Sequence, residues 1–205
     1  QKGLMMPPGL SFVWFSDKAK DVSEAADLAT PYWNWRTRCF SPEFYKAFAG
    51  TAPPQQLYGL REALALITEE GIDAVVARHQ TLARAVWAAV DAWGAGGEIG
   101  LNVADPAARS HAVTSIRIGN GGAVHLRRWA EDNAGLTLGI GLGMALPTEP
   151  AYHDHLRLAH MGHVNAHMTL GALAVMQAGL LALDIPHASG AIERAAAVIA
   201  DATRL

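Results

Sequence analysis

The feature that most constrains the fold is a helical pattern that runs, with one interruption, from residue 55 to residue 93. Apolar side chains recur at helical spacing between Gln55 and Glu70, at Leu57, Leu60, Leu64 and Ile67. Gly71 is expected to stop this helix, and a second helix is predicted from Ile72 to Trp93, where Gly94, Gly96 and Gly97 end it. Together the two predict a long, nearly continuous helical spine.

The segment before the spine is predicted to be mixed and irregular. Residues Leu10 to Phe15 follow a Pro-Pro-Gly turn and are rich in β-forming types, which predicts a strand. Ser16 and Asp17 are expected to cap a helix that extends to about Leu28. Residues 30–51 are aromatic, without periodicity, and punctuated by proline and glycine. A stretch of that length is usually functional or lies at an interface.

The segment after the spine is predicted to be an α+β unit. Strands are expected near Ala112–Ile118, Leu136–Ile140 and His155–His160. Helices are expected at about Ala123–Asn133, Asn165–Leu183 and Ser189–Thr203.

Composition excludes several classes of protein. Hydrophobic residues make up 51% and charged residues 17% of the chain, enough apolar material for a sizeable core. The net charge is -3 without a basic block, which argues against a nucleic-acid partner. No segment reaches the roughly 18 uninterrupted apolar residues of a membrane helix. Cys39 is the only cysteine, which fits a reducing compartment, so a cytoplasmic location is expected.

The first candidate for chemistry is Lys2, which precedes the turn Pro7-Pro8-Gly9. Apolar surroundings disfavour the ammonium form of a lysine, so a neutral amine becomes available to condense with a carbonyl. A lysine that forms a Schiff base needs this property. Composition alone favours an exposed lysine before a turn, because most lysines lie at the surface. The residues by themselves leave both interpretations open.

Several motifs in one order resemble those of class V pyridoxal-phosphate-dependent aminotransferases, in particular the serine–glyoxylate and alanine–glyoxylate enzymes. These are Gln1-Lys2-Gly3-Leu4 with its Pro-Pro-Gly, Pro31-Tyr32-Trp33-Asn34-Trp35, Leu57-Tyr58-Gly59-Leu60-Arg61-Glu62-Ala63-Leu64 and Arg157-Leu158-Ala159-His160-Met161-Gly162. The resemblance covers most of the chain. It implies an α/β plus α+β chain of fold type I: residues 1–54 end the large cofactor domain, 55–104 form the interdomain spine, and 105–205 form the small C-terminal domain.

The resemblance also implies a cofactor and an activity. Pyridoxal 5'-phosphate would be held by Lys2 as a Schiff base, and Lys2 would then move the proton. The reaction implied transfers an amino group from a small amino acid, serine or alanine, to a 2-oxo acid such as glyoxylate. Thr51 is implied to reach the cofactor phosphate of the other subunit in a homodimer, and Gln1 is a second candidate for a phosphate. Relatives often have a tyrosine where this chain has Phe48, so one phosphate contact is in doubt.

Arg157 is the candidate for substrate binding. A guanidinium group holds a carboxylate with two parallel hydrogen bonds, which a lysine cannot do. The residue type alone favours a surface ion pair, which is the more common role of an arginine on a strand. The resemblance implies that Arg157 binds the substrate carboxylate.

A histidine cluster is the main rival signal, with members at His153, His155, His160, His163 and His167. Three of them, His160, His163 and His167, have the spacing of one helical face and could bind a metal. Against this, Gly162 interrupts the series and the helix is expected to begin near Asn165, which favours packing or hydrogen-bonding roles. A metal-binding domain and a non-catalytic assembly module of the family's shape remain alternatives.

The groups that bind the pyridine ring in the family are not found in these 205 residues. The chain is therefore expected to be the carboxy-terminal half of the enzyme. An amino-terminal half, which could be a separate polypeptide, is expected to be needed for activity.

Overall fold

The computed structural model describes residues 1–48 and 50–202 and divides the chain into two compact units. One unit extends from Gly3 to Leu66 and the other begins at Ile67, so the boundary falls inside helix α3 (Pro54–Glu70). The division into three parts predicted from the sequence stays a prediction. Thr203, the predicted end of the last helix, lies outside the described residues.

The first unit contains one regular helix before α3 and otherwise short turns. Helix α1 (Asp17–Ala25) begins as expected: the Ser16 hydroxyl accepts a hydrogen bond from the Ala19 amide at 3.3 Å. It ends three residues before the predicted Leu28. The irregular stretch that follows holds only α2 (Arg36–Cys39) and the 3-10 turn η1 (Phe44–Ala47).

The predicted strand at Leu10–Phe15 is wrong. These residues form no strand, and Trp14 is 85% exposed. A strand needs a neighbour that accepts and donates its backbone hydrogen bonds. All the strands among the described residues belong to the second unit, so this segment has no partner of its own. High β propensity does not form a strand without pairing.

The helical spine is confirmed. Helix α3 is followed, after Gly71 alone, by helix α4 (Ile72–Gly94). Gly71 has φ +85°, a backbone conformation that side-chain-bearing residues rarely adopt, and this explains the break. The C-terminal part of α4 is buried from Leu82 to Trp93 along one face.

A four-stranded antiparallel sheet in the order β1-β2-β4-β3 forms the centre of the second unit. The predicted strands are found as β2 (Val113–Ile118), β3 (Gly139–Ile140) and β4 (His155–Ala159), with β3 shorter than expected. Strand β1 (Ile99–Leu101) was not predicted, because three residues are too few for a period to be recognised. The 3-10 turns η2 (Pro106–Ala108) and η3 (Pro150–Asp154) lie in the connections.

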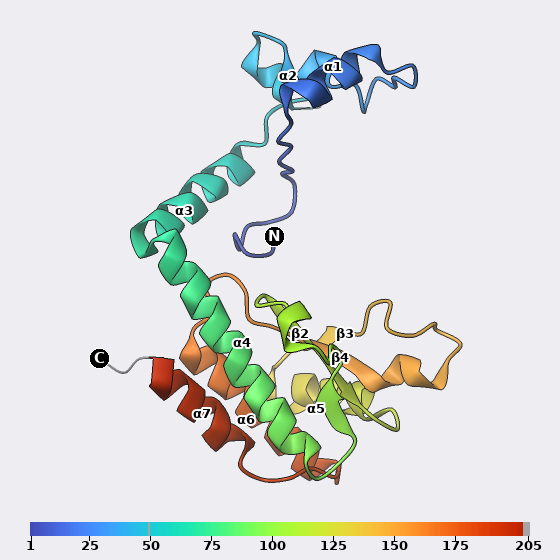
Figure 1. The fold of residues 1–205 in the computed structure, drawn as a ribbon, viewed down its shortest axis with the longest axis vertical. Coiled ribbons are helices and arrows are strands. Elements are labelled where there is room, and N and C mark those ends of the chain that lie inside the picture. Colours follow the sequence, from blue (N-terminus) through green and yellow to red (C-terminus); the bar gives the residue numbers. More distant parts are fainter. Residues whose placement is uncertain (49, 203–205) are drawn as a thin grey trace. The chain divides into compact units, whose positions relative to one another are not determined.

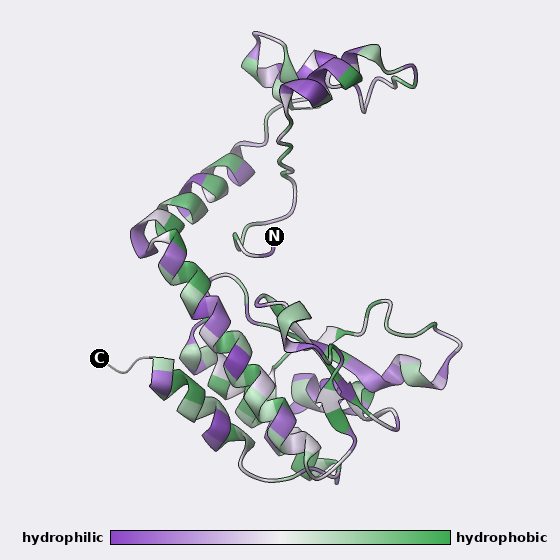
Figure 2. Cartoon of the chain, viewed as in Figure 1, coloured by the Kyte–Doolittle hydropathy of each residue, from purple (hydrophilic) through white to green (hydrophobic). Residues whose placement is uncertain are grey.

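Helices α4 and α5 (Gly122–Ala134) pack against the sheet, and α6 (Ala166–Ala182) and α7 (Ala191–Ala202) pack against these helices (Figure 1). Hydrophobic residues run along α4, α6 and α7 (Figure 2). In β2 the side chains alternate, with Ile116 and Ile118 buried in the core and Ser115 on the opposite face. Because β4 alternates in the same way, Arg157 also lies on the face away from the helices.

None of the helices in the described part of the chain is both long enough and apolar enough to cross a bilayer.

Candidate functional site

Arg157 lies on an inner strand of the sheet and is partly buried. It pairs across the sheet with Ser115 of β2 on one side and Gly139 of β3 on the other. Its Nε donates a hydrogen bond to the Ile140 carbonyl at 2.7 Å. Within the described residues, no carboxylate pairs with Arg157. One edge of the guanidinium is thus fixed to the sheet, and its terminal amino groups are left for a carboxylate ligand.

Gly139 makes room for this arginine. A Cβ atom at Gly139 would lie 3.2 Å from the Arg157 carbonyl oxygen and 3.3 Å from its Cβ, closer than such atoms normally approach. Sequence reasoning selected Arg157 but missed Gly139 and Ile140. The sequence signal that pointed to them was the glycine-rich stretch from Gly135 to Gly143. One of its glycines, Gly139, pairs with Arg157 across the sheet.

Gln1 and Lys2 are exposed at the start of the chain. The apolar surroundings expected for Lys2 are not formed by the described residues, since the segment that follows has no regular structure before α1 and is largely exposed. The physical reason is the same as for the missing strand at residues 10–15: this segment has no sheet of its own to pack on.

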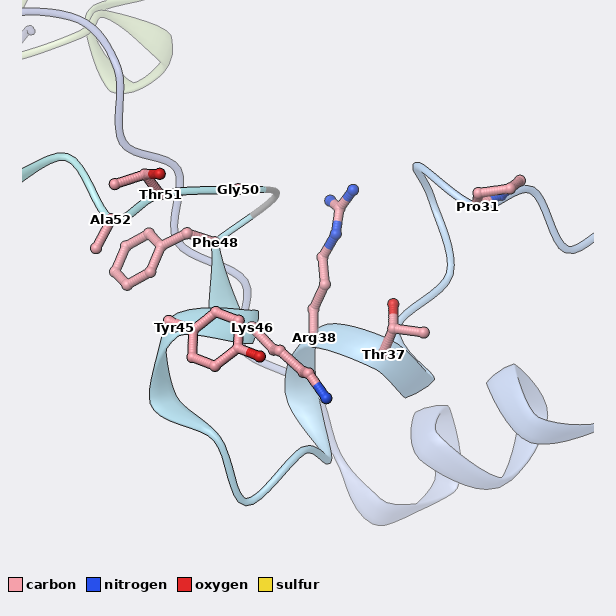
Figure 3. A pocket seen from close by; sticks show the side chains of 9 residues that line it. All are labelled: Pro31, Thr37, Arg38, Tyr45, Lys46, Phe48, Gly50, Thr51 and Ala52. Atoms are coloured by element: carbon pink, nitrogen blue, oxygen red, sulfur yellow. The ribbon is translucent and has the colours of Figure 1, made fainter.

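Thr51 lines an open pocket of about 790 Å³ in the first unit (Figure 3). Two cationic side chains, Arg38 and Lys46, line the same pocket, as do the hydroxyl-bearing Thr37 and Tyr45. Figure 3 shows Arg38 extending between the loop of Thr51 and the segment of Pro31. Cations and hydroxyl donors around one space are the groups that bind a phosphate.

The two cations of this pocket differ in their partners. Lys46 forms an ion pair with Glu43, and the Tyr45 hydroxyl donates to the same carboxylate at 3.2 Å. The hydrogen bond from Lys46, and to a smaller extent that from Tyr45, holds the pKa of Glu43 below its usual value. The Arg38 guanidinium lies 4.7 Å from the centre of the Tyr32 ring and has no carboxylate partner among the described residues. The pocket therefore has a positive charge to offer an anion.

The sequence indicated Thr51 but not Arg38 or Lys46, and the only signal for them was their position in the irregular stretch 30–51. Of the other predicted site residues, neither Gln1 nor Lys2 is among those that line this pocket. Arg157 belongs to the second unit.

The histidine cluster does not form the helical face that a metal site would need. Helix α6 begins at Ala166 with Asn165 as its N-cap, as expected, so His160 and His163 lie before the helix. Within the described part of the chain, no group of three or more histidine, cysteine or acidic side chains could hold a metal ion.

His160 is instead a hydrogen-bonded residue of the core, 1% exposed. Its Nδ1 donates to the His111 carbonyl at 3.0 Å, which leaves Nε2 to accept from the Thr114 hydroxyl at 2.9 Å. The Thr114 oxygen in turn accepts from Trp87 Nε1 at 3.0 Å. This chain of bonds needs a neutral imidazole. Burial, aided by repulsion from His79 and His111, lowers the pKa of His160 to about 4, although the bond to the His111 carbonyl opposes the shift.

A pH-dependent stability follows from His160. Between pH 6.5 and about 4, the unfolded chain protonates this histidine, whereas the folded protein keeps it neutral. The contribution of His160 to stability is therefore fully present above pH 6.5 and falls by about 3 kcal/mol as the pH approaches 4. Denaturant unfolding at a series of pH values measures the slope. The variant His160→Gln should show a flatter profile between these values, whereas the exposed His167→Gln should keep the original slope. Equal slopes in all three proteins would contradict the assignment.

Comparison with known proteins identifies the family. Residues 1–160 match the family model for aminotransferase class-V. The chain is 35% identical over 188 residues to a serine–glyoxylate aminotransferase of Methylorubrum extorquens, covering 88% of the chain and 44% of that relative. It is 31% identical over 187 residues to an L-aspartate–glyoxylate aminotransferase of Paracoccus denitrificans, covering 91% of the chain and 44% of that relative. The chain thus spans less than half the length of these relatives.

The fold agrees with the sequence. The structure of a ureidoglycine–glyoxylate aminotransferase from Bacillus subtilis superposes with a TM-score of 0.77 at 22% identity, covering 97% of this chain and 50% of that one. The architecture is that of the fold type I transferases, which was the fold class expected, and the family implies pyridoxal 5'-phosphate as cofactor. The match across residues 1–160 shows that the chain belongs to the class-V aminotransferase family.

Proposed function

We propose that this chain forms the carboxy-terminal part of a pyridoxal-phosphate-dependent aminotransferase that transfers an amino group from a small amino acid to a 2-oxo acid such as glyoxylate. The observation that supports this most directly is Arg157, held to the Ile140 carbonyl at 2.7 Å beside Gly139, with no carboxylate partner among the described residues. Amino acids and 2-oxo acids share a carboxylate, so one arginine can orient both substrates in turn.

Lys2 is proposed as the residue that binds the cofactor and moves the proton. Its Nζ would hold the cofactor covalently. As a free amine, it would take the proton from the substrate Cα and donate it to a carbon of the cofactor. When bound, the cofactor supplies an electron sink for the charge that develops at Cα. Gln1, its neighbour, is proposed as a phosphate ligand.

Thr51 is proposed to bind the cofactor phosphate of the other subunit in a homodimer. The pocket that it lines supports this, because Arg38 and Lys46 add positive charge beside the hydroxyl group. A phosphate in this pocket would gain charge-assisted hydrogen bonds, which are the stronger kind. The single cysteine fits a cytoplasmic location, which we also propose.

The contribution of the pocket predicts opposite effects for two substitutions. Thr51→Val removes a donor without changing the shape, so the affinity for the cofactor should fall about tenfold. Phe48→Tyr adds a hydroxyl at the pocket edge and should raise the affinity several-fold. Absorbance titration with pyridoxal 5'-phosphate measures both, with the exposed Thr148→Val as the control. Unchanged affinity in Thr51→Val would contradict the phosphate role.

Trapping of the cofactor tests the proposed function as a whole. The purified protein would be incubated with pyridoxal 5'-phosphate, reduced with borohydride and mapped by peptide mass spectrometry, and amino-group transfer from serine, alanine or aspartate to glyoxylate would be followed in parallel. One adduct on Lys2 together with transfer supports the proposal.

Two results would contradict it. Zinc that stays bound after dialysis and is lost in His163→Ala would favour the metal-binding alternative. Absence of an adduct and of transfer, when the remaining half of the family's length is supplied in the same or a separate polypeptide, would favour a non-catalytic assembly module.

A further inference from the structure

The turn that follows β4 is held by side chains of the spine. The Gly162 amide donates to Nε2 of His79 at 2.9 Å. Nη1 of Arg78 donates to the Gly162 carbonyl and to the Val164 carbonyl, both at 2.8 Å. Three backbone groups of a turn outside any helix or strand thus find their partners on α4, far away in the sequence. We refer to Arg78 and His79, with Glu70, as the clasp.

The hydrogen bonds of the clasp are specific to the residues that form it. His79 Nδ1 donates to the Val75 carbonyl at 2.6 Å, which fixes the ring and leaves Nε2 as an acceptor. Nε and Nη2 of Arg78 donate hydrogen bonds to the two carboxylate oxygens of Glu70, at 2.6 and 2.8 Å. The remaining group, Nη1, is therefore directed at the turn. This fork also lowers the pKa of Glu70. A lysine could not make four such bonds from one planar group.

The turn that the clasp holds, residues 161–164, lies close to Arg157 along the chain. Arg157 is in the middle of β4, and His160, directly after the strand, is bonded to Thr114 of β2. Gly162 follows two residues later, with φ +82°. The C-terminal end of β4 is therefore fixed twice, once to its neighbouring strand and once to α4. The Arg157 side chain itself has only the bond to Ile140 among the described residues. Substrate orientation depends on sub-ångström placement of such a group.

We propose that Arg78 and His79 are positioning residues for the carboxylate-binding Arg157, acting through the turn 161–164 and the end of β4. This inference rests on the proposed function of Arg157. In this role neither Arg78 nor His79 touches the substrate. Their effect is to keep β4 in one conformation, so that the guanidinium is already oriented when a carboxylate arrives.

Steady-state kinetics of the enzyme test the proposal. His79→Leu removes the acceptor for the Gly162 amide, so KM for the amino acid and for the 2-oxo acid should rise about tenfold, with a smaller change in kcat. His79→Gln retains an acceptor oxygen and should restore most of the affinity. The exposed His167→Leu is the matched control. If His79→Leu does not fold, Arg78→Lys keeps the charge, loses the fork and should show the same rise in KM.

A double-mutant cycle shows whether the clasp acts through Arg157. If it does, His79→Leu should raise KM by less than about twofold in the Arg157→Lys background, because the group it positions is already altered. Full additivity of the two effects, or an unchanged KM in the clasp variants, overturns the proposal. If Arg157→Lys itself leaves KM unchanged, the proposed function of Arg157 fails first and the positioning role falls with it.

Hydrogen exchange gives a measurement that does not depend on activity. In His79→Leu, exchange in a peptide covering residues 155–164 should become faster, whereas a peptide from α5, residues 123–134, should not change. Unchanged exchange in the first peptide overturns the proposal even if KM changes, because β4 would then be as ordered without the clasp as with it.

Discussion

Replacing Lys2 by alanine is expected to lower amino-group transfer by at least about a thousandfold, because both covalent attachment and proton transfer are lost together. The trapped adduct should disappear from the peptide that begins at Gln1. Lys2→Arg should be equally inactive, since a guanidinium is not deprotonated and cannot condense with an aldehyde.

The control for this experiment is Lys18→Ala, a change at another exposed lysine. It should retain both the adduct and the activity. Transfer within tenfold of the original in Lys2→Ala, or an adduct on a different lysine, would contradict the assignment. The result is informative because Lys2 and Lys18 are both exposed among the described residues, so exposure alone does not distinguish them.

Arg157→Lys is expected to lower kcat/KM for carboxylate substrates by about a hundredfold. A lysine keeps the positive charge but loses the two parallel hydrogen bonds to the carboxylate and the bond that fixes the side chain to Ile140. Trapping of the cofactor on Lys2 should be unaffected, because this step does not involve a substrate carboxylate.

Arg194→Lys, at an exposed position of α7, is the matched control and should behave as the unmodified protein. A loss of cofactor trapping in Arg157→Lys would indicate damage to the fold instead of loss of a substrate contact. An unchanged kcat/KM would show that the substrate carboxylate is bound elsewhere.

The sequence predicted the helices well because their hydrogen bonds are local. The apolar spacing from Leu57 to Ile67 is present within α3, and Gly71 interrupts the spine through its own backbone preference. Ser16 caps α1 as the sequence indicated, and α6 begins beside Asn165, near which its start was expected, since a cap is a contact between residues three apart. The family motifs are likewise runs of neighbouring residues, and they correctly indicated the class V aminotransferases.

Strands and sites were less predictable because their partners are distant in sequence. Residues 10–15 have strand-forming side chains but no neighbouring strand, and they form no regular structure and are mostly exposed. Strand β1, with three residues, exists only because β2 pairs with it. In the same way, no local pattern predicts that Arg38 and Lys46 line one pocket with Thr51.

The sequence by itself thus determined the main helices, the family and the residue types that can perform the chemistry. Only the tertiary structure decided that Gly139 lies opposite Arg157, that His160 is a neutral hydrogen-bonded residue of the core, and that Arg78 and His79 hold the turn after β4. The physical reason is the range of the interactions. Periodicity and capping act over one or two helical turns, whereas sheet pairing and buried hydrogen bonds join segments that meet only when the whole unit has folded.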